Sequence, residues 1–216
     1  MSRVMFRRKK TKRINGKKDM RSERELPEKL KKKLFRNLSE RRYEHTLGVA
    51  YTAACLAMRF GADPLKAEIA GLLHDCAKEF SEKELLKLGE KYGYHFEDYE
   101  LEAPQVLHAV IGPYIAKDKY GVEDPEILSA IRWHTTGKPD MAPLEKIIYL
   151  ADYIEPTRDF PGVDTLRGLA YEDLDRALLL GLQMTIEEVR SHGEEPYIDT
   201  LTACAWYEER ISERRD

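Results

Sequence analysis

Four of the six histidines in this chain, together with two aspartates, lie in apolar segments where a polar side chain needs a partner. His74 and Asp75 are adjacent and directly follow Gly71-Leu72-Leu73. Imidazole and carboxylate are both metal ligands, and a bound cation would offset the cost of burying the carboxylate. A lone His-Asp pair is more often a structural hydrogen-bonded pair, so the prediction depends on the whole set. Its members are His45, His74, Asp75, His108, His134 and Asp152.

These six side chains come from five predicted helices, and chance pairing does not readily satisfy so many polar groups in apolar surroundings. By contrast, His95 lies in a predicted loop and His192 precedes Gly193, so both are expected at the surface. Nitrogen and carboxylate ligands suit iron, manganese, cobalt, nickel or zinc better than calcium or magnesium. One catalytic metal with open positions cannot use six ligands. We therefore expect two metals bridged by Asp75, which could activate water and clamp a phosphoryl oxygen.

The elements that must position these residues are all predicted to be helices. Apolar residues recur at helical spacing from Pro27 onward, and no alternating β-branched run predicts a strand. Pro27 suits a first helical turn, and residues 94–102 are expected to form a loop. The sequence thus predicts an all-α bundle of nine or ten helices over residues 26–216. The expected N-caps are Ser39, Asp63, Ser81 and Asp124, and the expected stops are Gly61, Gly93, Gly121 and Pro156.

The charge is divided unevenly along the chain. Residues 1–42 carry 18 Lys/Arg and 5 Asp/Glu, whereas residues 43–216 carry 18 and 34. Residues 1–25 contain few apolar side chains and are predicted to be a disordered basic tail, either merely solubilising or in weak contact with a polyanion such as RNA. No signal peptide or membrane span is recognisable, and three widely spaced cysteines suggest reduced core residues of a cytoplasmic protein.

The pattern formed by His45, His74, Asp75 and Asp152 resembles the signature of the HD-domain metal-dependent phosphohydrolase superfamily. The similarity to the bacterial YqeK family is closer and covers about residues 27–210. It is carried by the segments 42–49, 74–75, 108–109, 131–137 and 150–163. This resemblance implies an iron-dependent hydrolase that cuts diadenosine tetraphosphate symmetrically into two ADP. Residues 1–26 lie outside it and inherit no role.

On this basis each candidate receives an expected role. Catalysis is assigned to Asp75, His108 and His134, and metal binding to His45, His74, Asp75 and Asp152, with His108 and His134 as further ligands of a second metal. Substrate binding is assigned to Arg42, His108, His134, Thr135, Thr136, Gly137, Asp152 and Arg158. Guanidinium groups match phosphate oxygens, although Arg42, Arg158 and Lys78 each read equally well as solvated surface charges.

Two other functions are compatible with the sequence. One is a hydrolase of another nucleotide phosphoester or anhydride within the same superfamily. The other is a non-enzymatic nucleotide-binding or ribosome-associated factor, in which the metal would be structural. Turnover with and without a chelator separates the enzymes from the binding protein. The partners expected are a dinucleotide substrate, the ADP product and a second copy of the chain in a homodimer, with no membrane.

Overall fold

The computed structural model describes residues 16–214, with side chains from residue 25 onward. Eleven α-helices and one 3₁₀ turn account for the regular structure of this part of the chain, which contains no strand, so the all-α prediction is confirmed. The helices are α1 (Gly16–Asn37), α2 (Glu40–Phe60), α3 (Pro64–Leu73), α4 (Glu82–Tyr92), α5 (Asp98–Leu101), α6 (Leu107–Tyr120), α7 (Pro125–Trp133), α8 (Pro143–Ile154), α9 (Val163–Glu172), α10 (Leu174–Ser191) and α11 (Ile198–Glu213), with η1 (Pro104–Val106) before α6.

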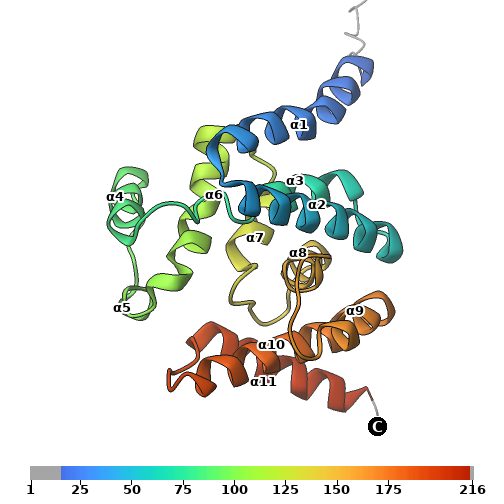
Figure 1. Ribbon diagram of the computed structural model, residues 1–216, viewed down its shortest axis with the longest axis vertical. Helices are drawn as coiled ribbons and strands as arrows, with labels where there is room; N and C mark the ends of the chain where they lie inside the picture. The colour runs from blue at the N-terminus through green and yellow to red at the C-terminus, as the bar shows by residue number, and fades with distance from the viewer. Residues whose placement is uncertain (1–15, 215–216) are drawn as a thin grey trace, which may run out of the picture.

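Helix α8 occupies the middle of the bundle (Figure 1). Helices α2, α3, α7, α9 and α10 all pack against it, and eight of its twelve residues are buried. Figure 1 shows α1 to α3 on one side of α8 and α9 to α11 on the other. This central position means that a polar residue near the end of α8, such as Asp152, is delivered to the interior and not to the surface.

The pair α2 and α3 is held unusually close. A Cβ atom added at Gly71 would lie 2.7 Å from the Ala50 Cα atom, so only glycine permits this crossing. Because His45 lies on α2 and His74 directly follows α3, the close contact sets the distance between these two imidazoles. Packing of α2 against α3 therefore determines part of the site geometry.

Helix starts mostly follow the predicted capping chemistry. Asp63 accepts from the Leu65 backbone N–H at 2.8 Å, and Asp124 from that of Glu126 at 2.9 Å. Ser81 and Glu84 form the expected capping box. Ser39 stands at the start of α2, but its side chain makes no capping hydrogen bond.

Two predicted boundaries are wrong. Residues 98–101 form α5 within the expected loop, because Glu97 and Glu100 make a capping box and Arg132 holds the Glu100 carboxylate at 3.0 Å. Helix α1 begins at Gly16, so Pro27 lies inside it and residues 16–25 are helical. Lysine, arginine, glutamate and methionine before Pro27 favour helix strongly enough to continue it at the cost of one hydrogen bond. The rest of the expected tail, residues 1–15, lies outside the described residues.

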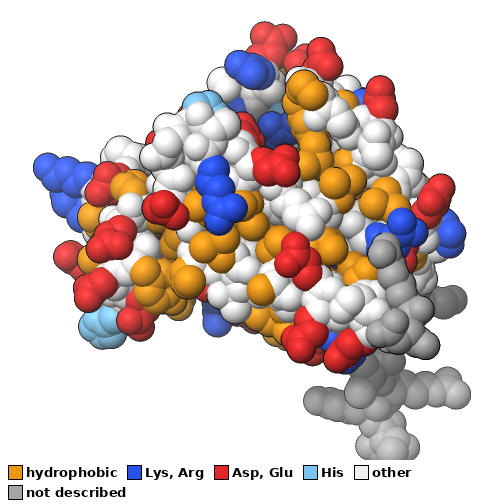
Figure 2. All heavy atoms as spheres, turned by 90° about the horizontal axis from the view of Figure 1, so that it is seen from below, with side chains coloured by type: hydrophobic (Ala, Val, Ile, Leu, Met, Phe, Trp, Pro, Cys, Tyr) orange, Lys and Arg blue, Asp and Glu red, His pale blue; other side chains and the backbone are white. Residues whose placement is uncertain are grey.

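The exposure of Cys55 corrects the expectation that all three cysteines lie in the core. All three cysteines are free, but Cys55 is exposed on α2, on the same outer face as Tyr51 and Met58. Figure 2 shows the molecule from below, with acidic side chains scattered among apolar ones. Among the described residues, no helix has the length and apolar character that crossing a bilayer requires.

Candidate metal centre

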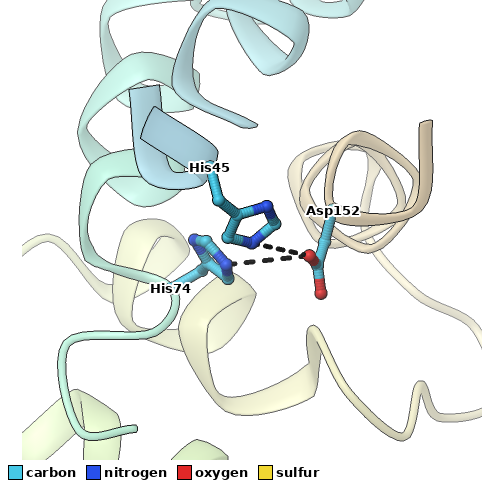
Figure 3. A group of neighbouring side chains, drawn as sticks. All are labelled: His45, His74 and Asp152. Carbon is cyan, nitrogen blue, oxygen red and sulfur yellow. Dashed lines mark ion pairs between the residues drawn. The ribbon is translucent and has the colours of Figure 1, made fainter. Parts of the chain in front are cut away.

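The six predicted side chains meet at one place, delivered by separate elements. His45 comes from α2, His74 and Asp75 from the turn after α3, and His108 from the first turn of α6. His134 follows α7, and Asp152 lies in the last turn of α8. Two sets of potential ligand atoms lie within 4.8 Å of one another, namely His45, His74 and Asp152, and His74, Asp75 and His134. Figure 3 shows the first set, with both imidazoles directed at the Asp152 carboxylate.

Three of the imidazoles are oriented by the same local hydrogen bond to the backbone. The Nδ1–H group of His74 donates to the Gly71 carbonyl at 2.7 Å, that of His108 to Gln105 at 2.8 Å, and that of His134 to Ile131 at 2.7 Å. Each acceptor lies three residues earlier in the chain. Since a carbonyl can only accept, Nδ1 carries the proton and Nε2 is left as the atom that faces the centre.

His45 lies within α2, where the backbone carbonyls are already used by the helix, and it takes a carboxylate partner instead. Its Nδ1–H group donates to Glu155 Oε1 at 3.0 Å, while its Nε2 lies 3.1 Å from Asp152 Oδ1. Glu155 is fully buried and also accepts from the Thr157 backbone N–H at 2.8 Å. Gly48 leaves the room for this carboxylate, since a Cβ there would lie 2.5 Å from Glu155 Oε2.

The Asp75 carboxylate faces two sides of the centre. Its Oδ1 lies 3.3 Å from His108 Nε2 and 3.5 Å from His134 Nε2, and its Oδ2 lies 3.8 Å from His74 Nε2. The Nε2 atoms of His108 and His134 are themselves 3.3 Å apart. Such a cluster of lone pairs is stable only with a proton or a cation between its members.

The buried Nε2 atom of His74 provides the test of whether a metal fits. It has no hydrogen-bond partner within the described structure, although an orphaned buried nitrogen is costly. It is also the ligand common to both potential sets. Two aspartates and four imidazoles with Nε2 turned inward make a donor set that suits a divalent metal ion.

Burial and neighbouring charges shift the pKa values of most of these side chains. Burial lowers the pKa of His74, and it lowers the pKa of His108 to about 4, so both imidazoles stay neutral. Burial alone would raise the pKa of Asp75, but the neighbouring histidines hold it well below its usual value. Burial also acts to lower the pKa of His45, yet Asp152 and Glu155 outweigh it and raise that pKa. His45 is therefore the ligand candidate whose proton would compete with a metal.

Three cationic side chains surround the centre. Arg42 lies 2.8 Å from Asp75 Oδ2 and 2.6 Å from Glu79, and Arg158 bonds both the side chain and the carbonyl of Asp152. Lys78 places its ammonium 3.2 Å from His108 Nε2. Burial lowers the pKa of Lys78, while Asp75 and Asp152 oppose this shift. These three groups therefore place positive charge directly beside the ligand candidates.

The turn after α7 is only partly directed at the centre. Thr135 places its hydroxyl 3.0 Å from His134 Nε2. Thr136 instead donates to the Gly137 carbonyl, and the Gly137 N–H bonds the Trp133 carbonyl. Gly137 also packs against Leu182 and Ala203. Thr135 is thus the residue of this turn that reaches the ligand candidates, whereas the donors of Thr136 and Gly137 bond backbone carbonyls at the turn.

Two supporting residues were missed from the sequence. Glu155 reads as a solvent-exposed charge at the end of α8; the available signal was its spacing of three residues from Asp152. Arg167 on α9 donates to the carbonyls of Ile154, Glu155 and Arg158 at 3.1, 3.1 and 2.7 Å. No local pattern predicts that contact, because it depends on how α9 folds back onto the end of α8.

Comparison with known proteins shows the family to which this chain belongs. The model of the HD domain matches residues 42–157, the segment that contains all six ligand candidates. The chain belongs to the HD-domain family. The all-α fold and the convergence of distant histidines and aspartates are those expected of an HD domain, and this membership supports a divalent metal cofactor.

Several relatives of this HD-domain protein carry the same name, symmetrical bis(5'-nucleosyl)-tetraphosphatase. The chain is 46% identical to the one from Bacillus subtilis, covering 78% of this chain and 90% of that protein. It is 35% identical to that of Staphylococcus aureus, with 86% and 98% coverage. A crystal structure from Clostridium acetobutylicum, described as a predicted HD superfamily hydrolase involved in NAD metabolism, superimposes with a TM-score of 0.82 at 43% identity, covering 85% of this chain and 97% of that one.

Proposed function

We propose that this protein is a metal-dependent hydrolase of dinucleoside tetraphosphates, which cuts diadenosine tetraphosphate symmetrically into two ADP. The observation that carries the proposal is the inward convergence of four imidazole Nε2 atoms and two aspartates beside Arg42, Lys78 and Arg158. Sequence identity to the tetraphosphatases of B. subtilis and S. aureus supports dinucleoside tetraphosphates over other nucleotides as the substrate class.

The cofactor we propose is iron, with two ions shared between the ligand sets. His45, His74, Asp75 and Asp152 would hold the first, and Asp75 with His108 and His134 would complete the second. Manganese, cobalt, nickel or zinc would be accepted by the same nitrogen and oxygen donors. Metals bound here would lower the pKa of a coordinated water and withdraw charge from a phosphoryl oxygen.

The residues of the chain would orient the substrate for cleavage between its two central phosphates. Arg158 and Lys78 neutralise phosphate charge on one ADP half, and the Thr135 hydroxyl donates to a phosphate oxygen. Arg42 is held by two carboxylates, so its first role is to fix Asp75, and it is available to phosphate only if Glu79 releases it. His108 and His134 border the cleavage position through their Nε2 atoms.

A substrate panel with controlled metal content tests this proposal. Metal-free protein is prepared by chelation, reloaded with each metal separately, and assayed with diadenosine tetraphosphate, diadenosine triphosphate, ATP and NAD. We expect turnover of the tetraphosphate that needs metal and yields ADP alone. Chelator-resistant turnover, or preference for ATP or NAD, would instead support another superfamily activity, and binding without any turnover would support a non-enzymatic factor.

A further inference from the structure

A cavity of about 630 Å³ opens directly beside the metal centre, between the end of α8 with its following loop and helix α10. Asp152 and Arg158 line it, so it is continuous with the metal ligands and with a cation proposed to hold phosphate. This volume lies within the range of small-molecule binding sites. The metal centre itself leaves the purpose of this space unexplained.

One wall of the cavity is apolar and held in place. Tyr153, Phe160 and Met184 line it, and the Tyr153 and Phe160 rings meet edge to face with centroids 5.9 Å apart. The Tyr153 hydroxyl is already bonded to Thr185, so the ring cannot turn freely. Gly162, at φ +91°, lets the loop pass Met184, because a Cβ there would lie 3.1 Å from the Met184 methyl group. The wall is thus formed before any ligand arrives.

The polar groups of the cavity have opposite charges on its two sides. Arg158 comes from the loop after α8, whereas Glu187 and Glu188 come from α10. Neither glutamate makes an ion pair with any described residue. A bare polyphosphate would be repelled by these carboxylates, and a purely apolar ligand would place an uncharged group against the Arg158 guanidinium. A ligand that matches Arg158, the two glutamates and the apolar wall carries phosphate at one end, hydroxyl donors in the middle and a flat apolar face.

We infer that this cavity binds the nucleoside of the ADP half whose phosphates lie on the metal centre. The base packs against Phe160 and Met184, and the ribose hydroxyls donate to Glu187 and Glu188, as carboxylates commonly accept from ribose. The inference rests on the proposed function. It adds that α10 and the loop after α8 select for a nucleotide over other phosphate compounds.

The first test is read on the wild-type protein, and a variant of the wall serves only to assign one signal. Methionine methyl groups are labelled with ¹³C in protein loaded with zinc, which is diamagnetic, and the Met184 signal is assigned with Met184→Leu, a substitution of similar volume. ADP is expected to shift the Met184 signal, and inorganic pyrophosphate, which offers the same phosphates without a nucleoside, is expected to leave it in place. Equal effects of both ligands, or no shift with saturating ADP, would overturn the inference.

The second test measures affinity. Phe160→Ala should weaken ADP binding by roughly fivefold to 150-fold, the range for losing an aromatic partner of a base, while pyrophosphate binding stays unchanged. The double substitution Glu187→Gln, Glu188→Gln should also weaken ADP alone. Phe35→Ala and Glu209→Gln are matched controls on α1 and α11, and should change neither ligand.

The two proposals fail in different ways. Absence of tetraphosphate turnover to ADP would overturn the proposed function as a whole. Normal turnover by the wild-type protein, with unchanged ADP affinity in folded Phe160→Ala, would overturn the nucleoside cavity alone. Melting temperature identifies a variant that has not folded, and in that case the wild-type methyl shifts decide.

Discussion

At the scale of single residues, the way each imidazole is held separates His45 from the other three. His74, His108 and His134 each donate to a backbone carbonyl three residues earlier, an acceptor that no side-chain substitution removes. His45 depends on the Glu155 carboxylate. Metal ligands held in this manner lose affinity when the outer partner is removed.

Glu155→Ala should therefore weaken metal binding by about 10-fold to 100-fold, and Glu155→Gln, which keeps an acceptor oxygen, should weaken it less. Competition with a chromogenic chelator gives the affinity. Glu79→Gln is the control, because Glu79 contacts Arg42 and no histidine. Wild-type affinity in Glu155→Ala would show that His45 does not need its carboxylate partner.

The protonation of His45 predicts how metal binding depends on pH. Its pKa is raised above 6.5, so in the metal-free protein its Nε2 is protonated below that pKa and must lose the proton to ligate. Metal affinity should fall as the pH drops through the His45 pKa, while His108, with a pKa of about 4, remains neutral. Histidine NMR of the metal-free protein measures both titrations. A His45 pKa below 6.5, or a His108 pKa above it, would contradict this assignment.

The sequence identified the ligand candidates because polar side chains in apolar segments are unusual, and that signal is local. It did not identify Glu155, whose position before Pro156 resembles an exposed helix end. The Thr136 hydroxyl and the Gly137 N–H bond backbone carbonyls at the turn, and the phosphate contact expected of these two residues stays a prediction. The burial of that turn against Leu182 and Ala203 depends on long-range packing.

At the scale of elements, the site is built from helix ends brought together by close packing. Caps predicted at Asp63, Ser81 and Asp124 are confirmed, since capping needs only neighbouring residues. The start of α1 and the presence of α5 were not predicted, because a four-residue helix has no periodic signal and a proline inside a helix resembles a start. The closeness of α2 and α3 is likewise set by a contact between segments.

Gly71→Ala tests that closeness. The added Cβ meets backbone of α2, which cannot rotate away, so overpacking should cost about 1–3 kcal/mol and lower the melting temperature by several degrees. Gly168→Ala on α9 is the control: nothing lies within 4 Å of its Cβ position, and we expect a small stabilisation. Equal melting temperatures for both variants would show that the α2–α3 contact can relax.

Arg167→Lys tests how the loop after α8 is held. Lysine offers its three donors from a single nitrogen and lacks the planar fork of the guanidinium, so it should keep fewer of these three hydrogen bonds. Arg158 should then be less well positioned, and kcat/KM for diadenosine tetraphosphate should fall several-fold with metal content unchanged. The matched change Arg176→Lys, on the exposed side of α10, should have no effect. Wild-type kinetics in Arg167→Lys would mean that the loop holds its own shape.

At the scale of the whole molecule, hydrophobic periodicity predicted a helical bundle, and the resemblance to the HD superfamily supplied its arrangement. Periodicity alone could not show that α8 lies in the centre, because a helix buried on all sides differs from an amphipathic one only by a few residues. Charge is divided unevenly between residues 1–42 and residues 43–216. Within the acidic part, Lys78 and Arg158 lie at the metal centre. A polyanion contact of residues 1–25 stays a prediction.

The measurement that tests the central claim most directly is product analysis in heavy-oxygen water. Metal-loaded wild-type protein should convert diadenosine tetraphosphate into two ADP, with one of them carrying a single solvent oxygen, and the folded variant Asp75→Asn should form almost none. Formation of ATP and AMP, or undiminished turnover by Asp75→Asn, would contradict the proposed role of this metal centre.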